Sequence, residues 1–253
     1  MPADARAGAE LVEPAGDMAV VECRGAIKRY GEVVAVAEIS FSLKRGTVTG
    51  FLGPNGAGKT TTLRMLLGLA EPTAGEALVF GRRYRELEQP IRRVGAVLES
   101  TDYHPRRSGR NHLRALALAA DLPLERVEEV LELVELRKAA SRPVRTYSLG
   151  MRQRLGVAAA LLGDPELLIL DEPANGLDPA GVRWLRTFLQ GLAAEGRTVL
   201  VSSHILAEVA QTVDQVLIID HGRLLAQGTL DELTRNGQTL EDVYLQLTEE
   251  TDL

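Results

Sequence analysis

Two short segments carry the residue types that bind and cleave phosphate groups. The first matches the pattern G-x-x-x-x-G-K-[ST], in which a glycine-rich loop ends in a lysine and a hydroxyl residue. Glycines let backbone N–H groups turn towards phosphate oxygens, and Lys59 can reach the β- and γ-phosphates. The hydroxyl of Thr60 can ligate Mg²⁺. The candidate nucleotide-binding residues of this loop are Gly53, Pro54, Asn55, Gly56, Ala57, Gly58, Lys59, Thr60 and Thr61.

The second segment is an apolar run, residues 167–170, that ends in the two carboxylates Asp171 and Glu172. Open α/β sheets bind ligands at the carboxyl ends of their strands, so Asp171 is predicted to hold Mg²⁺ directly or through water. Glu172 is predicted to polarise the attacking water, which needs a carboxylate within hydrogen-bond reach. Two acids can also simply terminate a strand, but their occurrence together with the phosphate loop favours a nucleoside triphosphate hydrolase.

The elements that must position these segments alternate between strands and helices. A strand before Gly53 and a helix after it are the context that a phosphate loop requires. Strand–helix–strand alternation predicts an α/β fold, with a mainly parallel sheet covered by helices. The predicted strands are residues 20–23, 39–43, 47–52, 77–80, 94–98, 167–170, 198–202 and 216–220, and the predicted helices are residues 59–69, 180–195 and 206–212.

The middle of the chain has a different pattern and predicts a helical insert at about residues 102–162. Within it, apolar residues from Leu124 to Val134 recur at helical spacing with glutamates between them, which indicates an amphipathic helix with a solvated acidic face. The expected organisation is a disordered lead-in over residues 1–17 and one domain over residues 18–253. A C-terminal helical extension is expected at about residues 229–253.

Composition and charge restrict the class of protein. The 253 residues are 45% hydrophobic and 25% charged, which suits a globular domain with its own core. The net charge of −6 disfavours a broad nucleic-acid groove, so no nucleic-acid partner is expected. The single cysteine, Cys23, fits a reducing, cytosolic setting. No apolar run approaches the ~20 residues of a membrane span, and the first residues lack the pattern of a secretory signal.

Further motifs resemble those of the ATP-binding subunits of ABC transporters. Residues 147–151, YSLGM, resemble the family's signature motif, usually written LSGGQ, and residues 174–179, ANGLDP, resemble its D-loop. The segment that ends in His204 is similar to the family's switch-histidine segment. Tyr30 occupies the position at which the family places an aromatic side chain on the adenine. The resemblance extends over about residues 18–247, nearly the whole chain.

The resemblance implies a P-loop NTPase core with an N-terminal antiparallel β subdomain and an inserted helical subdomain, which hydrolyses ATP with Mg²⁺. Two subunits, identical or different, would meet head to tail with ATP between them. Ser148 and the N–H of Gly150 would contact the γ-phosphate across the interface, and His204 would bridge it to the partner's D-loop, which contains Asp178. A separate integral membrane permease is implied, as is a cytoplasmic location, peripheral on the inner face of the cell membrane.

Three residues depart from the family's usual motifs. Leu149 replaces the first signature glycine and Met151 replaces the last residue, but Ser148 and Gly150 remain, so the γ-phosphate contact is expected to survive. Glu99 stands at the Q-loop position, where it is expected to act in catalysis and bind Mg²⁺ or water, although it cannot donate a hydrogen bond as an amide can. Glu99 and the sequence YSLGMRQRLG resemble drug, antibiotic and lantibiotic exporters, so export is expected.

Two other functions remain open from the sequence. A non-transport ABC ATPase in a soluble complex usually carries tandem modules or a long coiled-coil insert, whereas this chain has a single P-loop and no sustained heptads. A module that senses ATP without hydrolysing it does not need both Glu172 and His204.

Several other residues of chemically versatile types are assigned simple roles. His104, His112 and His221 share no metal-ligand spacing, so they are interpreted as surface or hydrogen-bonded histidines. Trp184 lies in a helical pattern and is expected to contribute to packing. The basic segment 101–110 follows the Q-loop position, where the family contacts a cytoplasmic helix of the membrane partner, so we hypothesise the same contact here.

Overall fold

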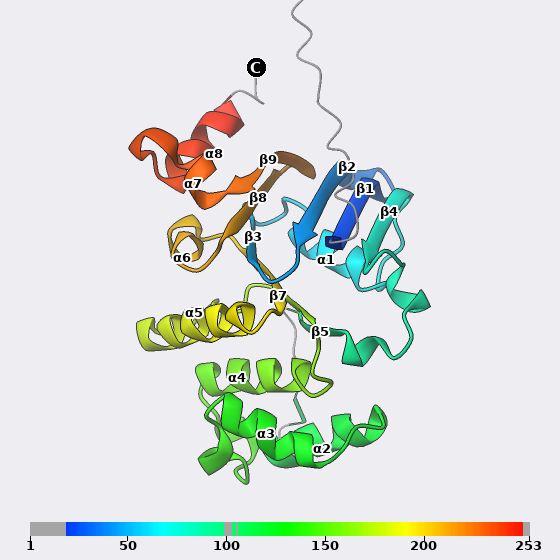
Figure 1. Cartoon of the computed structure of the whole chain (residues 1–253), viewed down its shortest axis with the longest axis vertical. Coiled ribbons are helices and arrows are strands. Elements are labelled where there is room, and N and C mark those ends of the chain that lie inside the picture. The colour runs from blue at the N-terminus through cyan, green and yellow to red at the C-terminus, as the bar shows by residue number, and fades with distance from the viewer. Residues whose placement is uncertain (1–18, 99–102, 105, 250–253) are drawn as a thin grey trace, which may run out of the picture.

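The computed structural model describes residues 19–98, 103–104 and 106–249, and two β-sheets organise this part of the chain (Figure 1). The smaller sheet is antiparallel, with the order β2-β1-β4. The larger has the order β5-β6-β7-β3-β8-β9 and is parallel except for the β8–β9 pair. The predicted α/β class with a mainly parallel sheet is confirmed. The strands are β1 Ala19–Tyr30, β2 Val33–Lys44, β3 Val48–Leu52, β4 Ala74–Val79, β5 Val94–Val97, β6 Leu167–Leu170, β7 Thr198–Ser203, β8 Gln215–Asp220 and β9 Arg223–Thr229.

Burial on both faces of the larger sheet explains why its central strands are continuous apolar runs. All four residues of β6 are buried. Because side chains alternate along a strand, Leu168 and Leu170 join the core formed with the helical part, whereas Leu167 and Ile169 join the core beneath the antiparallel sheet. The sheet is thus fixed between two apolar layers, and the carboxyl ends of its strands are held in a defined arrangement.

The helices form separate groups around the larger sheet. Figure 1 shows α2, α3 and α4 together at one end of the molecule, with α7 and α8 at the opposite end beside β8 and β9. No helix among residues 19–249, apart from the undescribed gaps, is long and apolar enough to cross a membrane. The α-helices are α1 Lys59–Leu66, α2 Gly109–Ala119, α3 Glu125–Leu133, α4 Leu149–Ala160, α5 Pro179–Ala194, α6 Leu206–Ala210, α7 Leu230–Leu233 and α8 Leu240–Glu249.

The structure corrects several predicted boundaries. The first two strands are much longer than their apolar centres, because register shifts let β1 continue past Cys23 to Tyr30. Strand β9 was not predicted, because an edge strand that is half-exposed mixes polar and apolar side chains without a regular period. Helix α1 ends at Leu66, since the N–H of Gly68 bonds back to the carbonyl of Met65 and closes the last turn. The expected lead-in, residues 1–17, and Glu99 lie outside the described residues.

Candidate functional site

The phosphate loop lies between a buried strand and the start of a helix, as its sequence context predicted. Strand β3 is buried throughout, and α1 begins at Lys59 directly after the loop. Gly58 has a φ of 104°, a left-handed conformation that L side chains rarely adopt. This conformation ends the loop and directs the N-terminus of α1, with its free N–H groups, towards the bend of the loop.

Lys59 is buried by the loop that precedes it. Its side chain is 5% exposed, and its ammonium donates to the carbonyl oxygens of Gly53 at 2.7 Å and Pro54 at 3.1 Å. A buried ammonium is costly unless it is hydrogen-bonded or paired. Here a third contact comes from Glu172, whose Oε1 lies 3.3 Å from the Lys59 ammonium. The cation is therefore held at the mouth of the loop and beside the predicted catalytic acid.

Asp171 connects the end of β6 to both the phosphate loop and the neighbouring strand β7. The residue is buried, and its Oδ2 accepts a hydrogen bond of 2.8 Å from the hydroxyl of Thr60. Its Oδ1 accepts one of 2.6 Å from the hydroxyl of Ser202. The sequence did not single out Ser202 because its contact with Asp171 depends on β6 and β7 being neighbours in the sheet. Thr60 and Asp171, predicted separately as metal ligands, are thus brought together.

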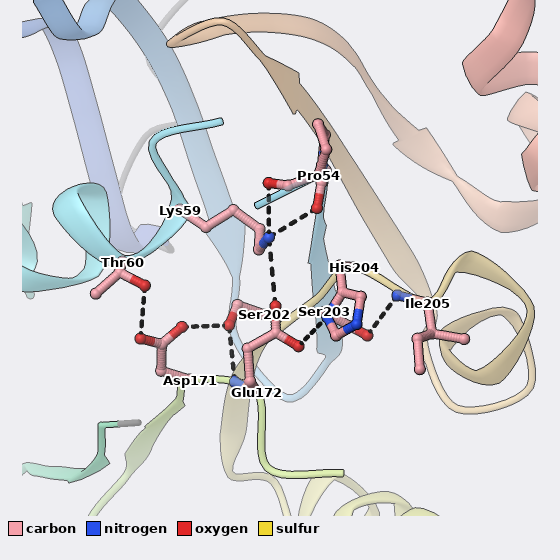
Figure 2. A network of polar contacts seen from close by, with 10 residues as sticks. Pro54, Lys59, Thr60, Asp171, Glu172, Ser202, Ser203, His204 and Ile205 are labelled. Carbon is pink, nitrogen blue, oxygen red and sulfur yellow. Dashed lines mark hydrogen bonds and ion pairs between the residues drawn. The ribbon is translucent and has the colours of Figure 1, made fainter. Parts of the chain in front are cut away.

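Glu172 has an unusual backbone conformation, with a φ of 50°. Its N–H donates to the hydroxyl of Ser202 at 2.9 Å. Its carboxylate is 11% exposed, and Oε2 lies 2.8 Å from Nδ1 of His204. Backbone strain of this kind persists only where the surroundings fix the residue. Contacts with Ser202, His204 and Lys59 provide that constraint, and Figure 2 shows these residues joined in one polar network.

A cavity of about 330 Å³ opens beside this network, within the usual size range of small-molecule sites. The phosphate loop, the segment between β6 and α5 and the residue that follows β7 all contribute to its wall. Ala35 of β2 lies outside every motif, and Asn175 belongs to the D-loop segment, which the resemblance assigns to the partner's nucleotide, so neither was predicted to line this cavity. The lining residues are Ala35, Pro54, Asn55, Gly56, Gly58, Lys59, Thr60, Thr61, Glu172, Asn175 and His204.

Other predicted site residues lie away from this cavity within the described part of the chain. Tyr30 ends β1 and is 49% exposed, with the Lys28 ammonium 4.9 Å from its ring centroid. Ser148 is exposed and caps α4 by accepting from the N–H of Met151 at 3.2 Å. Asp178 is exposed and caps α5 in the same way. Local capping accounts for the backbone geometry of these two residues.

The signature and D-loop segments lie side by side in this chain. The side-chain amide of Gln153 in α4 donates to the carbonyl of Pro173 at 3.0 Å. A Cβ placed on Gly176 would lie 2.6 Å from Cδ2 of Leu149, and one placed on Gly150 would lie 3.6 Å from Leu177. Leu149, which departs from the usual signature, therefore packs over a position that has no side chain. Residues far apart in sequence thus form one exposed surface.

Two of the remaining predictions concern side chains outside this surface. Trp184 stacks on Phe188 at a centroid distance of 5.1 Å and lies under the guanidinium of Arg154, so it does contribute to packing. His112 packs edge-on against Tyr103, and burial lowers the pKa of its imidazole. Its Nδ1 is buried without a hydrogen-bond partner among the described residues. The interpretation of His112 as a surface or hydrogen-bonded histidine is therefore wrong for this nitrogen.

Comparison with known proteins gives a consistent result. The sequence profile of the family described as "ABC transporter" matches residues 36–175. Bacitracin transport ATP-binding protein BcrA of Bacillus licheniformis is 42% identical over 226 residues, which cover 88% of this chain and 74% of the relative. Lantibiotic transport ATP-binding protein SrtF of Streptococcus pyogenes is 33% identical over 217 residues, which cover 86% of this chain and 92% of the relative.

Solved structures agree with the sequence relatives. One described as "Structure of ATP binding subunit of ABC transporter" matches with a TM-score of 0.80 at 30% identity, covering 90% of this chain and 99% of the other. A second, cbiO1 from Clostridium perfringens, matches with a TM-score of 0.78 at 26% identity, covering 93% and 98%. Sequence and fold lead to the same conclusion: this chain belongs to the ABC transporter family and is an ATP-binding, ATP-hydrolysing subunit of such a transporter.

Proposed function

We propose that this subunit binds ATP with Mg²⁺ in the cavity beside the phosphate loop, uses Glu172 to activate water, and energises a separate permease that exports a drug, an antibiotic or a similar compound. The observation that carries the proposal is the single network in which the buried Asp171 joins Thr60 and Glu172, both of which line the cavity (Figure 2). A relative named for Nod factor export supports the direction of transport, and relatives named for bacitracin and lantibiotic transport support the class of compound.

Lys59 is suited to bind the β- and γ-phosphates. In the structure its ammonium bonds to two loop carbonyls and pairs with Glu172. Phosphate oxygens that enter the loop compete for the same ammonium, and a multiply charged anion is a stronger partner than a carbonyl. Binding of ATP is thereby expected to weaken the Lys59–Glu172 pair and to leave the carboxylate of Glu172 available to a water molecule.

Glu172 is suited to act as the base. Its carboxylate lines the cavity and can take a proton from water as the water oxygen attacks the γ-phosphorus and the bond to the β-phosphate oxygen breaks. His204 contacts the same carboxylate at 2.8 Å through Nδ1 and lines the same cavity, so it can hold Glu172 in place while its ring lies beside the γ-phosphate. We assign catalysis to Glu172 and His204, and include Glu99 as a third catalytic residue on the basis of its sequence position.

The residues around Thr60 fit a magnesium ion. The hydroxyl of Thr60 and the carboxylate of Asp171 are hard oxygen ligands that already lie 2.8 Å apart. Mg²⁺ in phosphoryl-transfer sites is usually bound by one or two carboxylates, and phosphates and waters complete its coordination. When bound, the ion would neutralise part of the negative charge of the phosphates. Glu99 is proposed as the third protein ligand.

A second ATPase subunit, identical or different, is proposed to complete the site. Ser148 and Asp178 are exposed and lie outside the cavity of their own chain, as residues that serve a partner's nucleotide must be. Ser148 and Gly150 are proposed to contact the γ-phosphate bound by the other subunit. Asp178 is proposed to lie in the D-loop that His204 of the other subunit bridges to that phosphate. Tyr30 is proposed to stack on adenine. The subunit is proposed to lie in the cytoplasm, on the inner face of the membrane, without a nucleic-acid partner.

Co-purification tests the transport assignment. The tagged chain is expressed in its native host, and membranes are solubilised in mild detergent with a non-hydrolysable ATP analogue. We expect a multi-span membrane protein in stoichiometric amount, because the proposed permease is a separate chain. A soluble complex without a membrane partner would contradict the transport assignment and favour a non-transport ATPase.

The basic segment before α2 is the predicted permease contact. Arg106 and Arg107 are both exposed, so their reversal to Glu is expected to weaken co-assembly with the permease through charge and to leave ATP turnover of the isolated subunit unchanged. The amount of permease in the same co-purification is measured. The control reverses Arg82 and Arg83, an exposed pair of equal charge near β4. Equal co-assembly of both double variants would exclude this contact.

A further inference from the structure

The turn between β8 and β9 is hydrogen-bonded to two walls of the nucleotide cavity. The N–H of Gly222 donates to the carbonyl of Ala57, in the phosphate loop, at 3.0 Å. The carbonyl of Gly222 accepts from the N–H of Ala37, in β2, at 2.7 Å. Ala35, two residues earlier in β2, lines the cavity. One residue outside every recognised motif thus connects the antiparallel sheet to the phosphate loop.

Gly222 also lies where an added side chain would be in tight contact with backbone atoms. Its φ is 76°, and an added Cβ would lie 3.0 Å from the carbonyl oxygen of Ala35 and 3.2 Å from Cα of Val36. From the other side, a Cβ on Gly58 would lie 2.5 Å from the same carbonyl oxygen and 3.5 Å from Cα of Gly222. The backbones of β2, the turn and the phosphate loop are therefore in direct contact. A methyl group at position 222 requires β2 and the turn to separate by a few tenths of an ångström, because backbone atoms cannot move aside as flexible side chains can.

The C-terminal helix α8 supports this turn. The side chain of Asp220 is 13% exposed, and its Oδ1 accepts from the N–H of His221 at 2.8 Å. Its Oδ2 accepts from the hydroxyl of Tyr244 at 3.2 Å. Burial and the neighbouring Asp220 raise the pKa of Tyr244, so its hydroxyl stays protonated as a donor at neutral pH. Contacts therefore run from α8 through Asp220 to Gly222 and the loop.

We propose that Gly222 is a positioning residue for nucleotide binding, which sets the separation of β2 and the phosphate loop, and that Tyr244 in α8 supports it through Asp220. The inference rests on the proposed placement of ATP in this cavity. Gly222 itself is not among the lining residues, so it acts through the phosphate loop, which it contacts at Ala57, and through β2, whose Ala35 lines the cavity. A change at Gly222 is therefore expected to alter nucleotide affinity more than turnover at saturating ATP.

The sharpest test compares two glycines with the same backbone conformation. Gly237 also has a φ of 76°, but nothing lies within 4 Å of an added Cβ there. Gly222→Ala and Gly237→Ala therefore carry similar backbone strain, and only the first has a steric conflict near the cavity. Affinity for a fluorescent ATP analogue, KM and kcat are measured in the full chain, with thermal unfolding as a check of the fold.

Gly222→Ala is expected to weaken nucleotide binding and raise KM by about tenfold with a smaller change in kcat, whereas Gly237→Ala changes both by less than about twofold. Equal affinities of the two variants would overturn the inference. If Gly222→Ala does not fold, Tyr244→Phe gives the second test, with Thr234→Val as its control, because each loses one hydroxyl hydrogen bond. Weaker nucleotide binding by Tyr244→Phe alone supports the inference, and equal binding overturns it.

A Lys59→Ala variant separates this inference from the proposed function. If Lys59→Ala binds the nucleotide analogue as tightly as the wild type, the placement of ATP in the cavity is wrong. If Lys59→Ala loses binding while Gly222→Ala behaves like Gly237→Ala, the placement stands and only the role of the β8–β9 turn is wrong.

Discussion

Glu172→Gln abolishes ATP turnover and leaves ATP binding intact: this is the largest change we expect from a single substitution. Gln has the shape of Glu, so it can keep a hydrogen bond to His204, which lies 2.8 Å from Oε2. It has no negative charge and cannot take a proton from water. Loss of a general base typically lowers the rate by about 10² to 10⁴-fold. Phosphate release is measured at saturating ATP, and binding is measured with a fluorescent analogue.

Binding by this variant is expected to be equal to or tighter than that of the wild type. Glu172→Gln removes the charge that pairs with Lys59 at 3.3 Å, so phosphate oxygens meet less competition for the ammonium. Because the bound ATP is not cleaved, the dimer is also expected to accumulate, and size-exclusion chromatography detects it. The control is Glu166→Gln, at the residue that precedes the first residue of β6. The Glu166 carboxylate forms ion pairs with Arg45 and Arg93 at the surface, and such pairs contribute little to the free energy of unfolding. Wild-type turnover by Glu172→Gln would disprove the assignment of the base.

Lys59→Ala is expected to lose most of its ATP affinity. Its ammonium is buried at the mouth of the phosphate loop, where a charge-assisted hydrogen bond to phosphate is less screened than in water. Hydrogen bonds to charged groups contribute about 1.5 to 3 kcal/mol, so the dissociation constant is expected to rise by about ten- to a hundredfold. Isothermal titration with ATP and Mg²⁺ measures this change directly.

The same substitution removes the ion-pair partner of Glu172, so protein stability must be measured as well. Thermal unfolding of Lys59→Ala with and without ATP shows whether the fold survives and whether the ligand still stabilises it. The matched control is Lys138→Ala, an exposed lysine in a short turn after α3. Wild-type affinity in a folded Lys59→Ala variant would show that the phosphates bind elsewhere.

The sequence alone determined the parts of the site that are continuous in the chain. The phosphate loop needs only a strand, a glycine-rich bend and a helix in succession, so its pattern predicts both its conformation and the place of Lys59. The end of β6 is equally local, because an apolar run followed by Asp171 and Glu172 shows where the strand stops. The two elements were therefore predicted with their chemistry before any contact between them was known.

Only the tertiary structure decided how these parts meet. The hydroxyl of Ser202 donates to Asp171 because β6 and β7 are neighbours in the sheet. The hydroxyl of Thr60 donates to the same carboxylate because β3, which leads into the phosphate loop, lies next to β7. Strand order depends on how helices pack across both faces of the sheet, which is a non-local property that no short window of sequence contains. The hydrogen bond between Gly222 and Ala57 has the same origin, because these two segments lie next to each other only after β2, β3 and β8 have assembled.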